Sequence, residues 1–188
     1  MSKRMNWKSD RRPRSLLVPA AWLFVGGLAS AAAATDTRAT NEWVFRVGSY
    51  SDSTPAIAPD GTVYFGTFDG RLWAVNKDGT PKWHYRAGRE IKSSPAVGKD
   101  GSIFFGSRDR KFYALTPEGR LRWEFKTGAW VDSSAALASE GTIYFGSWDK
   151  KLYALNSQGE KLWEFATGGP VVSSPAIEIG RASCRERV

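Results

Sequence analysis

The chain has 188 residues, enough for one domain with a sizeable core, and 13% of them are aromatic, including nine Trp. Its formal net charge of +8 is concentrated at the two ends, because residues 1–34 contribute +5 and residues 178–188 contribute +1. The remaining +2 is spread over residues 35–177, where basic and acidic side chains are interspersed. This part offers no basic stripe that could follow a phosphate backbone, so a nucleic-acid partner is excluded.

Residues 1–34 are typical of an export signal. Six Lys or Arg side chains precede an apolar stretch at 16–28, and small residues at 29–34 suit cleavage by a signal peptidase. We expect cleavage between Ala31 and Thr35, which would place the mature chain in the periplasm or outside the cell, with no stable membrane span.

Two alternatives for export stay open. The apolar stretch could remain as an uncleaved membrane anchor, although it is short and interrupted by Pro19. The pair Arg11-Arg12 could direct the chain to twin-arginine export instead of general secretion, although Pro13 follows it. In either case, residues 35–42 would link the signal to the folded part.

From Trp43 onward the sequence repeats every 40 residues. Each unit begins with Trp, has an aromatic residue two positions later and glycine five positions later, and continues with short apolar runs between turn residues. The runs are rich in β-branched and aromatic residues, which favours strands, and pairs such as Asp60-Gly61 favour tight hairpins. We predict four strands per unit, at 53–58, 62–67, 71–76 and 82–86, recurring at intervals of 40. The repeated Trp residues are Trp43, Trp83, Trp123 and Trp163.

Four antiparallel strands in about 40 residues are typical of one β-propeller blade. A blade cannot bury both of its apolar faces alone, so we expect blades to stack side by side with the repeated Trp residues between them. The predicted fold class is therefore all-β: a β-propeller of four-stranded antiparallel blades. Residues 43–177 would hold about three blades plus one strand of an incomplete ring.

An alanine, a glycine and a tryptophan recur with the spacing A-x4-G-x3-W late in each unit. This spacing resembles the tryptophan docking motif of pyrroloquinoline-quinone-type (PQQ-like) β-propeller repeats, and the resemblance covers residues 43–177. It implies that the alanine and the tryptophan lock adjacent blades. A WD-type propeller fits less well, because only Trp148-Asp149 matches its Trp-Asp pair. The motif residues are Ala74, Gly79 and Trp83; Ala114, Gly119 and Trp123; and Ala154, Gly159 and Trp163.

The repeat pattern ends after Ile177. Residues 178–188 resemble the in-frame translation of a sequencing adapter, and we predict that they are a non-native tail; a genuine basic tail is the alternative. Cys184, the single cysteine, lies in this segment. No disulfide, metal thiolate or cysteine nucleophile is therefore expected in the repeats.

Function is expected where the units differ from one another. Seven and twenty-five residues after each Trp the residue type changes from unit to unit, and alternating strand directions place these two loops at the same end of each blade. Exposed aromatic and charged side chains on one face favour a ligand- or protein-binding surface, with ordinary loop variation as the alternative. The candidate residues of this binding face are Tyr50, Phe68, Glu90, Arg108, Trp130 and Trp148.

Catalytic chemistry finds little support in the sequence. The single histidine, His84, falls on a predicted outer strand between two aromatic residues, and no nucleophile–base set or metal-ligand cluster can be assembled around it. The repeated Asp69, Asp109 and Asp149 could bind a ring of ions. They fall in turns, however, where Asp commonly accepts hydrogen bonds from nearby backbone, and this structural role is favoured.

These observations predict a non-enzymatic exported scaffold that binds a protein or a small ligand. In role it would be similar to the propeller subunit of the outer-membrane β-barrel assembly machinery. Two alternatives are the N-terminal half of a quinone-dependent alcohol or sugar dehydrogenase, and a ligand-sensing ectodomain. No cofactor is evident in the sequence, and PQQ with calcium is expected only if the full-length protein is such a dehydrogenase.

Overall fold

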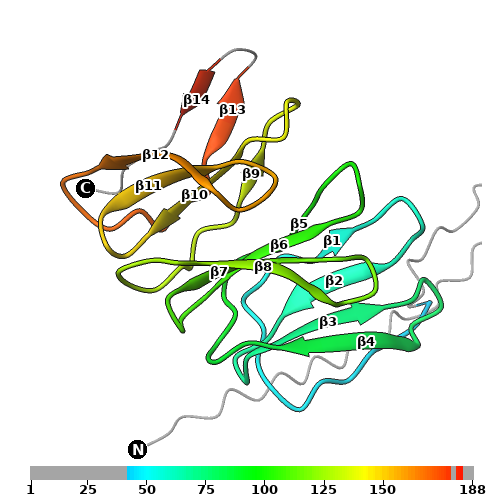
Figure 1. Cartoon of the computed structure of the whole chain (residues 1–188). Helices are drawn as coiled ribbons and strands as arrows, with labels where there is room; N and C mark the ends of the chain where they lie inside the picture. Colours follow the sequence, from blue (N-terminus) through cyan, green and yellow to red (C-terminus); the bar gives the residue numbers. More distant parts are fainter. Residues whose placement is uncertain (1–41, 179–180, 184–188) are drawn as a thin grey trace, which may run out of the picture. The chain divides into compact units, whose positions relative to one another are not determined.

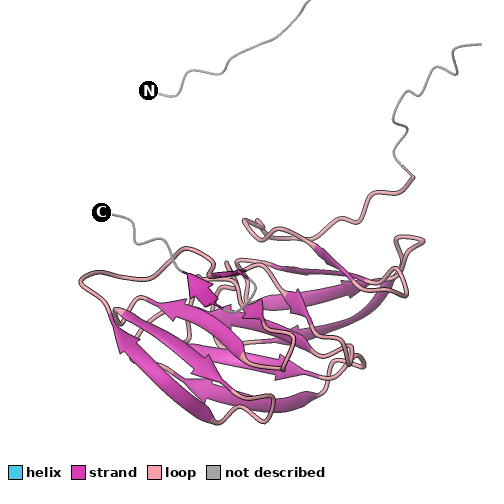
Figure 2. Ribbon diagram, turned by 90° about the horizontal axis from the view of Figure 1, so that it is seen from above, coloured by secondary structure: helices cyan, strands magenta, loops and turns pink. Residues whose placement is uncertain are grey.

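The computed structural model describes residues 42–178 and 181–183, and all regular secondary structure in these ranges is β-strand (Figure 1). The strands form three four-stranded antiparallel sheets and one two-stranded hairpin; Figure 2 shows the same strands from above. The predicted all-β fold class and its four-stranded blades are confirmed. The predicted export signal at 1–34 and nearly all of the linker at 35–42 lie outside the described residues.

Each sheet is one blade, with its strands in chain order. Blade 1 consists of β1 (Ala56–Ile57), β2 (Val63–Gly66), β3 (Arg71–Val75) and β4 (Pro81–Arg86). Blade 2 consists of β5 (Ala96–Val97), β6 (Ile103–Ser107), β7 (Lys111–Leu115) and β8 (Leu121–Lys126). Blade 3 consists of β9 (Ala136–Leu137), β10 (Ile143–Ser147), β11 (Lys151–Leu155) and β12 (Lys161–Ala166). The hairpin pairs β13 (Ala176–Glu178) with β14 (Arg181–Ser183).

The first strand of each blade is shorter than predicted. The prediction gave 53–58 for blade 1, whereas β1 has only two residues. Just before β1, the hydroxyl of Ser53 accepts a hydrogen bond from Gly66 N at 3.1 Å, so a side chain takes the place of a backbone partner. Pro55 also has no N–H to donate to a neighbouring strand. The serine–glycine bond recurs at the equivalent positions of the other two blades.

Left-handed backbone conformations mark the turns. In the β1–β2 hairpin, Gly61 has a φ of 84°, as its Asp-Gly pair predicts. The turn between the second and third strands of each blade also contains a residue of positive φ. In blade 1 this residue is Gly70 (φ 80°), but in the other blades it is Arg110 (φ 70°) and Lys150 (φ 66°). Two blades thus hold a basic residue in a conformation that favours glycine.

Adjacent blades pack face to face through aromatic side chains. On one face of blade 1, Tyr64, Ala74 and Trp83 are cross-strand neighbours, and the ring centroids of Tyr64 and Trp83 are 5.7 Å apart. This face joins one buried cluster with residues of β6 and β7. Blades 2 and 3 share a second cluster, in which Phe112 stacks on Phe145 with centroids 4.0 Å apart. Each blade therefore obtains its core from its neighbour.

The first and last sheet faces are covered differently. Over blade 1, the ring of Phe45 lies 5.3 Å from that of Trp73. On the far face of blade 3, Trp163 is 42% exposed and Phe165 is 63% exposed. These two aromatic side chains occupy the positions that in blades 1 and 2 are packed against the next blade.

The β13–β14 hairpin includes residues that the sequence analysis assigns to a non-native tail. Ile177 pairs with Ala182, and Glu178 pairs with Arg181. Residues 184–188, with Cys184, lie outside the described part of the chain.

Candidate interaction site

The repeated tryptophans lie at the junctions between blades. Trp83 Nε1, in β4, donates a hydrogen bond to Pro117 O in the β7–β8 turn of the next blade, at 2.9 Å. A Cβ atom built on Gly119 would lie only 2.6 Å from Cδ2 of Trp83, so glycine is required where the indole rests. Trp43 and Trp123 make the same bond to Lys77 O and Ser157 O, over Gly79 and Gly159.

The alanine of the repeated motif lies opposite the tryptophan within the same blade. Ala74 pairs with Trp83, Ala114 with Trp123 and Ala154 with Trp163, and all three alanines are completely buried. A larger side chain at these positions would fill the space that the indole occupies. Trp163 differs from the other three tryptophans, because its indole N–H has no acceptor among the residues that the structure describes.

The six candidate residues of the binding face form three backbone pairs at one end of the blades, which we call the rim end. It consists of the loops that precede the first strand and the turns between the second and third strands. The amide of the later residue of each pair donates to the carbonyl of the earlier one at 2.9 Å. The pairs are Tyr50 with Phe68, Glu90 with Arg108, and Trp130 with Trp148.

Side-chain contacts join the second and third pairs. The Arg108 guanidinium lies 4.5 Å from the ring centroid of Trp130, and the rings of Trp130 and Trp148 meet edge to face at 5.6 Å. Arg108 also donates two hydrogen bonds to the carboxylate of Asp132, at 3.0 and 2.9 Å. Trp148 Nε1 donates to the same carboxylate at 3.0 Å. The guanidinium belongs to blade 2 and the two rings to loops of blade 3, so this contact spans two blades.

The first pair is arranged similarly around a lysine. The rings of Tyr50 and Phe68 meet edge to face at 6.5 Å, and Lys92 Nζ lies 4.5 Å from the ring centroid of Phe68. Lys92 Nζ also lies 3.3 Å from a carboxylate oxygen of Asp52. Glu90 contributes its backbone to the face, while its carboxylate lies 3.4 Å from Arg89 Nε.

The residues that share these contacts at the rim end are called the rim cluster. Lys92 and Asp132 were not among the residues predicted from the sequence. They lie nine residues after their repeated Trp, in a column that varies among Asp52, Lys92 and Asp132. That variation is the same signal that identified the other candidates. The cluster consists of Tyr50, Phe68, Lys92, Arg108, Trp130, Asp132 and Trp148.

Arg108 and Asp132 are held in a partly buried setting. Their side chains are 21% and 13% exposed. Hydrogen bonding to Asp132 raises the pKa of Arg108 above its ordinary value, while burial acts in the opposite direction. A paired arginine and carboxylate with two parallel hydrogen bonds has a fixed geometry. The indoles that contact this pair are therefore held in place while they remain more than a third exposed.

The repeated turn aspartates make contacts within and between blades. Asp109 Oδ2 accepts hydrogen bonds from Gly88 N of the preceding loop at 2.8 Å and from Tyr113 OH at 2.6 Å. Asp149 makes the equivalent bonds to Gly128 N and Tyr153 OH. Among the described residues, no group of three or more His, Cys, Asp or Glu side chains could hold a metal ion. His84 is exposed in β4, with its ring 4.9 Å from that of Trp73.

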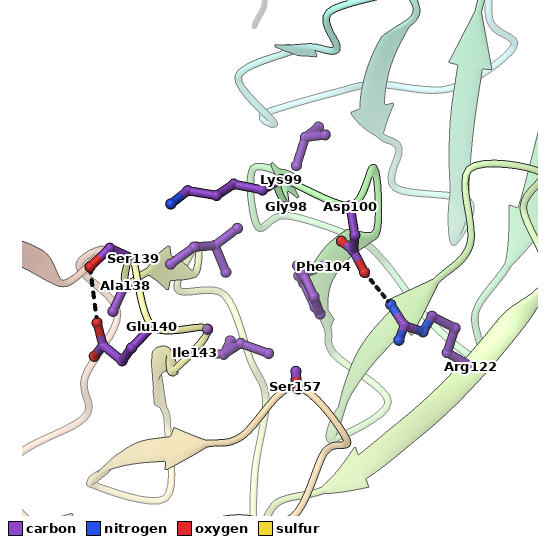
Figure 3. Close-up of a pocket in the computed structure, with 13 residues that line it drawn as sticks. Gly98, Lys99, Asp100, Phe104, Arg122, Ala138, Ser139, Glu140, Ile143 and Ser157 are labelled. Atoms are coloured by element: carbon purple, nitrogen blue, oxygen red, sulfur yellow. Dashed lines mark hydrogen bonds and ion pairs between the residues drawn. The ribbon is translucent and has the colours of Figure 1, made fainter.

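A pocket of about 380 Å³ lies at the opposite end of the blades, which we call the hairpin end (Figure 3). The β5–β6 and β9–β10 turns flank it, and Phe104 and Ile143 form part of its apolar lining. Asp100 and Arg122, joined at 2.7 Å, line another part. The pocket is open beside Gly141, where a Cβ would meet no atom within 4 Å. This pocket was not predicted from the sequence.

None of the described residues forms a helix that is long and apolar enough to cross a membrane.

Four-stranded blades joined by the tryptophan of one blade and the glycine turn of the next define a PQQ-like β-propeller. The chain belongs to the family described as outer membrane protein assembly factor BamB, whose sequence model matches residues 4–124 and 87–181. No individually curated protein matches the chain.

Two solved structures illustrate the shared fold. BamB from Moraxella catarrhalis superposes with a TM-score of 0.63 and 16% identity, over 71% of this chain and 43% of that one. The WD40 domain of Pan2 from Neurospora crassa superposes with a TM-score of 0.56 and 17% identity, over 64% of this chain and 40% of that one. The chain spans about two fifths of each structure, and at this identity the likeness shows the fold alone.

Proposed function

We propose that this chain is part of an exported, non-enzymatic propeller that binds a protein partner through the rim cluster. The observation that carries the proposal is the arrangement around Asp132, which accepts hydrogen bonds from both Arg108 and Trp148 while Arg108 lies against Trp130. Two indoles and a guanidinium are thereby oriented before any partner arrives. Membership in a family of outer-membrane assembly factors supports a scaffold role in the periplasm.

The residue types of the rim cluster match those that dominate protein interfaces. Trp, Tyr and Arg are enriched among the residues that contribute most to binding energy. Tyr50 is 83% exposed, and Trp130 and Trp148 are 37% and 39% exposed. Because these side chains are already ordered by contacts within the chain, less conformational entropy is lost when a partner covers them.

Photo-crosslinking in native cells tests this proposal. A photoreactive phenylalanine analogue replaces Tyr50 in the full chain, and the periplasmic fraction is examined for covalent adducts. We expect one discrete adduct with a single protein, which the Trp130→Ala/Trp148→Ala double variant weakens strongly. The same analogue at Ile57, which is 71% exposed in β1, is the control and should give no such adduct.

Three results would contradict the proposal. One is the absence of an adduct from Tyr50, and another is an adduct that the double alanine variant leaves unchanged. The third concerns chemistry, because we propose that the protein works without a cofactor. Oxidation of an alcohol or a sugar by the full-length protein after addition of quinone and calcium would show an enzyme instead.

A further inference from the structure

We infer that the rim end recognises an acidic segment of its partner that also carries aromatic side chains, and that Arg110 and Lys150 contact its carboxylates. This inference rests on the proposed function, because it names the chemistry of the partner at the same face. Four observations support it: the charge of the rim end, the backbone conformation of the two residues, the exposure of their side chains, and their position beside the rim cluster.

Charge is distributed unequally between the two ends of the blades. The loops of the rim end contain eleven Lys or Arg and six Asp or Glu residues, a formal excess of five positive charges. The turns of the hairpin end contain six of each and are balanced. The rim-end segments counted are 46–52, 67–71, 86–92, 107–111, 126–132, 147–151 and 166–172, and the hairpin-end segments are 58–62, 76–82, 98–102, 116–122, 138–142 and 156–161.

Arg110 and Lys150 occupy a strained backbone position. Their φ values are 70° and 66°, whereas blade 1 has Gly70 at the same place in the turn. A side chain in this region meets steric conflict that glycine avoids, and such residues persist where a function or the surrounding structure requires them. The surrounding structure does not demand a side chain here, since Gly70 O accepts the backbone bond from Ala87 N just as Arg110 O accepts one from Thr127 N.

The two side chains are available to a partner. Both residues are exposed, and within the described part of the chain neither side chain takes part in an ion pair. By contrast, the neighbouring Arg108 is bound to Asp132, and Lys111 Nζ lies 2.6 Å from Glu124. Lys111 is also the cross-strand partner of Lys126, so the strand positions beside Arg110 hold two further basic residues.

Arg110 and Lys150 each lie in a turn that also contains a residue of the rim cluster. Arg110 follows Arg108 by two residues in the β6–β7 turn, and Lys150 follows Trp148 by two residues in the β10–β11 turn. A segment that combined carboxylates with aromatic side chains could therefore contact the free cations and the exposed indoles together. A purely acidic ligand would contact the cations and leave the exposed indoles without a partner.

Fluorescence anisotropy with the full chain and labelled eight-residue peptides tests the inference. The probe alternates glutamate and tyrosine, and two control peptides alternate glutamate with alanine and lysine with tyrosine. We expect the glutamate–tyrosine peptide to bind most tightly and its affinity to fall as salt is added, because surface charges are screened.

The informative variant is Arg110→Gly/Lys150→Gly. Loss of two exposed ion pairs should weaken binding of the glutamate–tyrosine peptide about three- to tenfold. The same change removes two strained residues, so Tm should rise or stay constant. A residue with a merely structural role would not combine weaker binding with an unchanged or higher Tm. Lys77→Ala/Arg120→Ala removes the same charge from the hairpin end and should leave binding unchanged.

The inference is overturned if the lysine–tyrosine peptide binds as well as the glutamate–tyrosine peptide, or if the glycine variant binds normally. It is also overturned if phosphatidylglycerol vesicles or duplex DNA bind more tightly than the acidic peptide. The proposed function is tested separately. A discrete adduct from Tyr50 without a preference for the glutamate–tyrosine peptide would reject only the acidic partner. Absence of both the adduct and the peptide preference would reject the proposed function as well.

Discussion

The indole nitrogen of Trp83 donates a 2.9 Å hydrogen bond to the carbonyl oxygen of Pro117, 34 residues away in the next blade. Trp43 and Trp123 make the same bond across the same sequence separation. The junction is therefore a repeated unit, made of one strand from one blade and one turn from the next. In such arrays, stability depends mainly on contacts between nearest neighbours. A substitution at one junction should therefore lower the free energy of unfolding mainly through the contact between those two blades.

Two glycine variants separate the contribution of the junction from that of the turn. Gly119→Ala adds a methyl group 2.6 Å from the Trp83 ring, at a backbone φ of 80°. Gly141→Ala adds a methyl group at a similar φ of 92°, but with no other atom within 4 Å. We expect Gly141→Ala to lower the free energy of unfolding by about 1 kcal/mol through backbone strain alone. Gly119→Ala should cost about 2–4 kcal/mol, because displacement of the indole is added. Urea unfolding of the full chain measures both. Equal losses would show that the indole does not rest on the glycine.

Periodicity explains why so much of the fold was predictable. The 40-residue spacing and the Asp-Gly turns identify the blades, because each strand and turn repeats the same local pattern. The short length of β1 was not predictable in this way. Gly66 N donates to the hydroxyl of Ser53 and not to a backbone carbonyl of β1, and these two residues meet only after the chain has folded back on itself. A serine in a strand-like run gives no local sign that it will accept this bond.

Alkaline pH should destabilise the fold through buried tyrosines. Burial, and then the hydrogen bond to Asp109, raise the pKa of Tyr113 above its ordinary value, and the same causes act on Tyr153 beside Asp149. A raised pKa in the fold means that the neutral form is stabilised there. This stabilisation is fully present below pH of about 10, the ordinary tyrosine value, and is lost as pH rises toward the folded value.

Thermal unfolding between pH 8 and pH 12 measures this effect, where these pH limits span roughly two units on either side of the ordinary tyrosine pKa. Tyr113→Phe should lower stability at pH 8 by about 1 kcal/mol, because one hydrogen bond is lost. The variant should also lose less stability than the parent as pH rises. Ultraviolet titration provides the second readout. Ionisation of Tyr113 near its ordinary pKa in a still folded chain would contradict the prediction.

The exposed face of blade 3 should cause self-association. Trp163 and Phe165 occupy positions that the next blade covers elsewhere, and here they are 42% and 63% exposed. Contiguous exposed aromatic side chains favour association with other apolar surfaces. We expect light scattering to show an apparent mass that rises with concentration. The Trp163→Gln/Phe165→Thr variant should be closer to a monomer, whereas Ile57→Thr, at an isolated exposed position, should behave as the parent. A monomeric parent chain would contradict this.

The rim cluster was only partly predictable for a different reason. Comparison of the units identified columns that vary, and the structure places these columns as backbone neighbours. Asp132 and Lys92 also lie in a column that varies between units, but variation alone does not show which variable residues touch, because that depends on contacts between blades. The strain at Arg110 is a property of φ, which residue type does not reveal. The nearly neutral average charge of the repeats also hid the difference between their two ends.

A double-mutant cycle measures how firmly the rim cluster is organised. Arg108→Met keeps much of the side-chain length without its charge, and Asp132→Asn keeps the shape of the acceptor. Arg108 and Asp132 share two hydrogen bonds of 3.0 and 2.9 Å, and such charge-assisted bonds are strong when sheltered. Partial exposure to solvent screens the pair, so we expect a coupling free energy of about 1 kcal/mol rather than the larger value of a buried pair.

Urea unfolding of the parent, the two single variants and the double variant gives this coupling. Tryptophan fluorescence gives an independent view, because Trp148 Nε1 loses a charged acceptor in Asp132→Asn and Trp130 loses the cation over its ring in Arg108→Met. If the pair orients the indoles, either single variant should both shift the emission and reduce the adduct formed from Tyr50. A coupling near zero, with emission and adduct unchanged, would mean that the indoles are positioned by the backbone alone and that the ion pair plays no part in recognition.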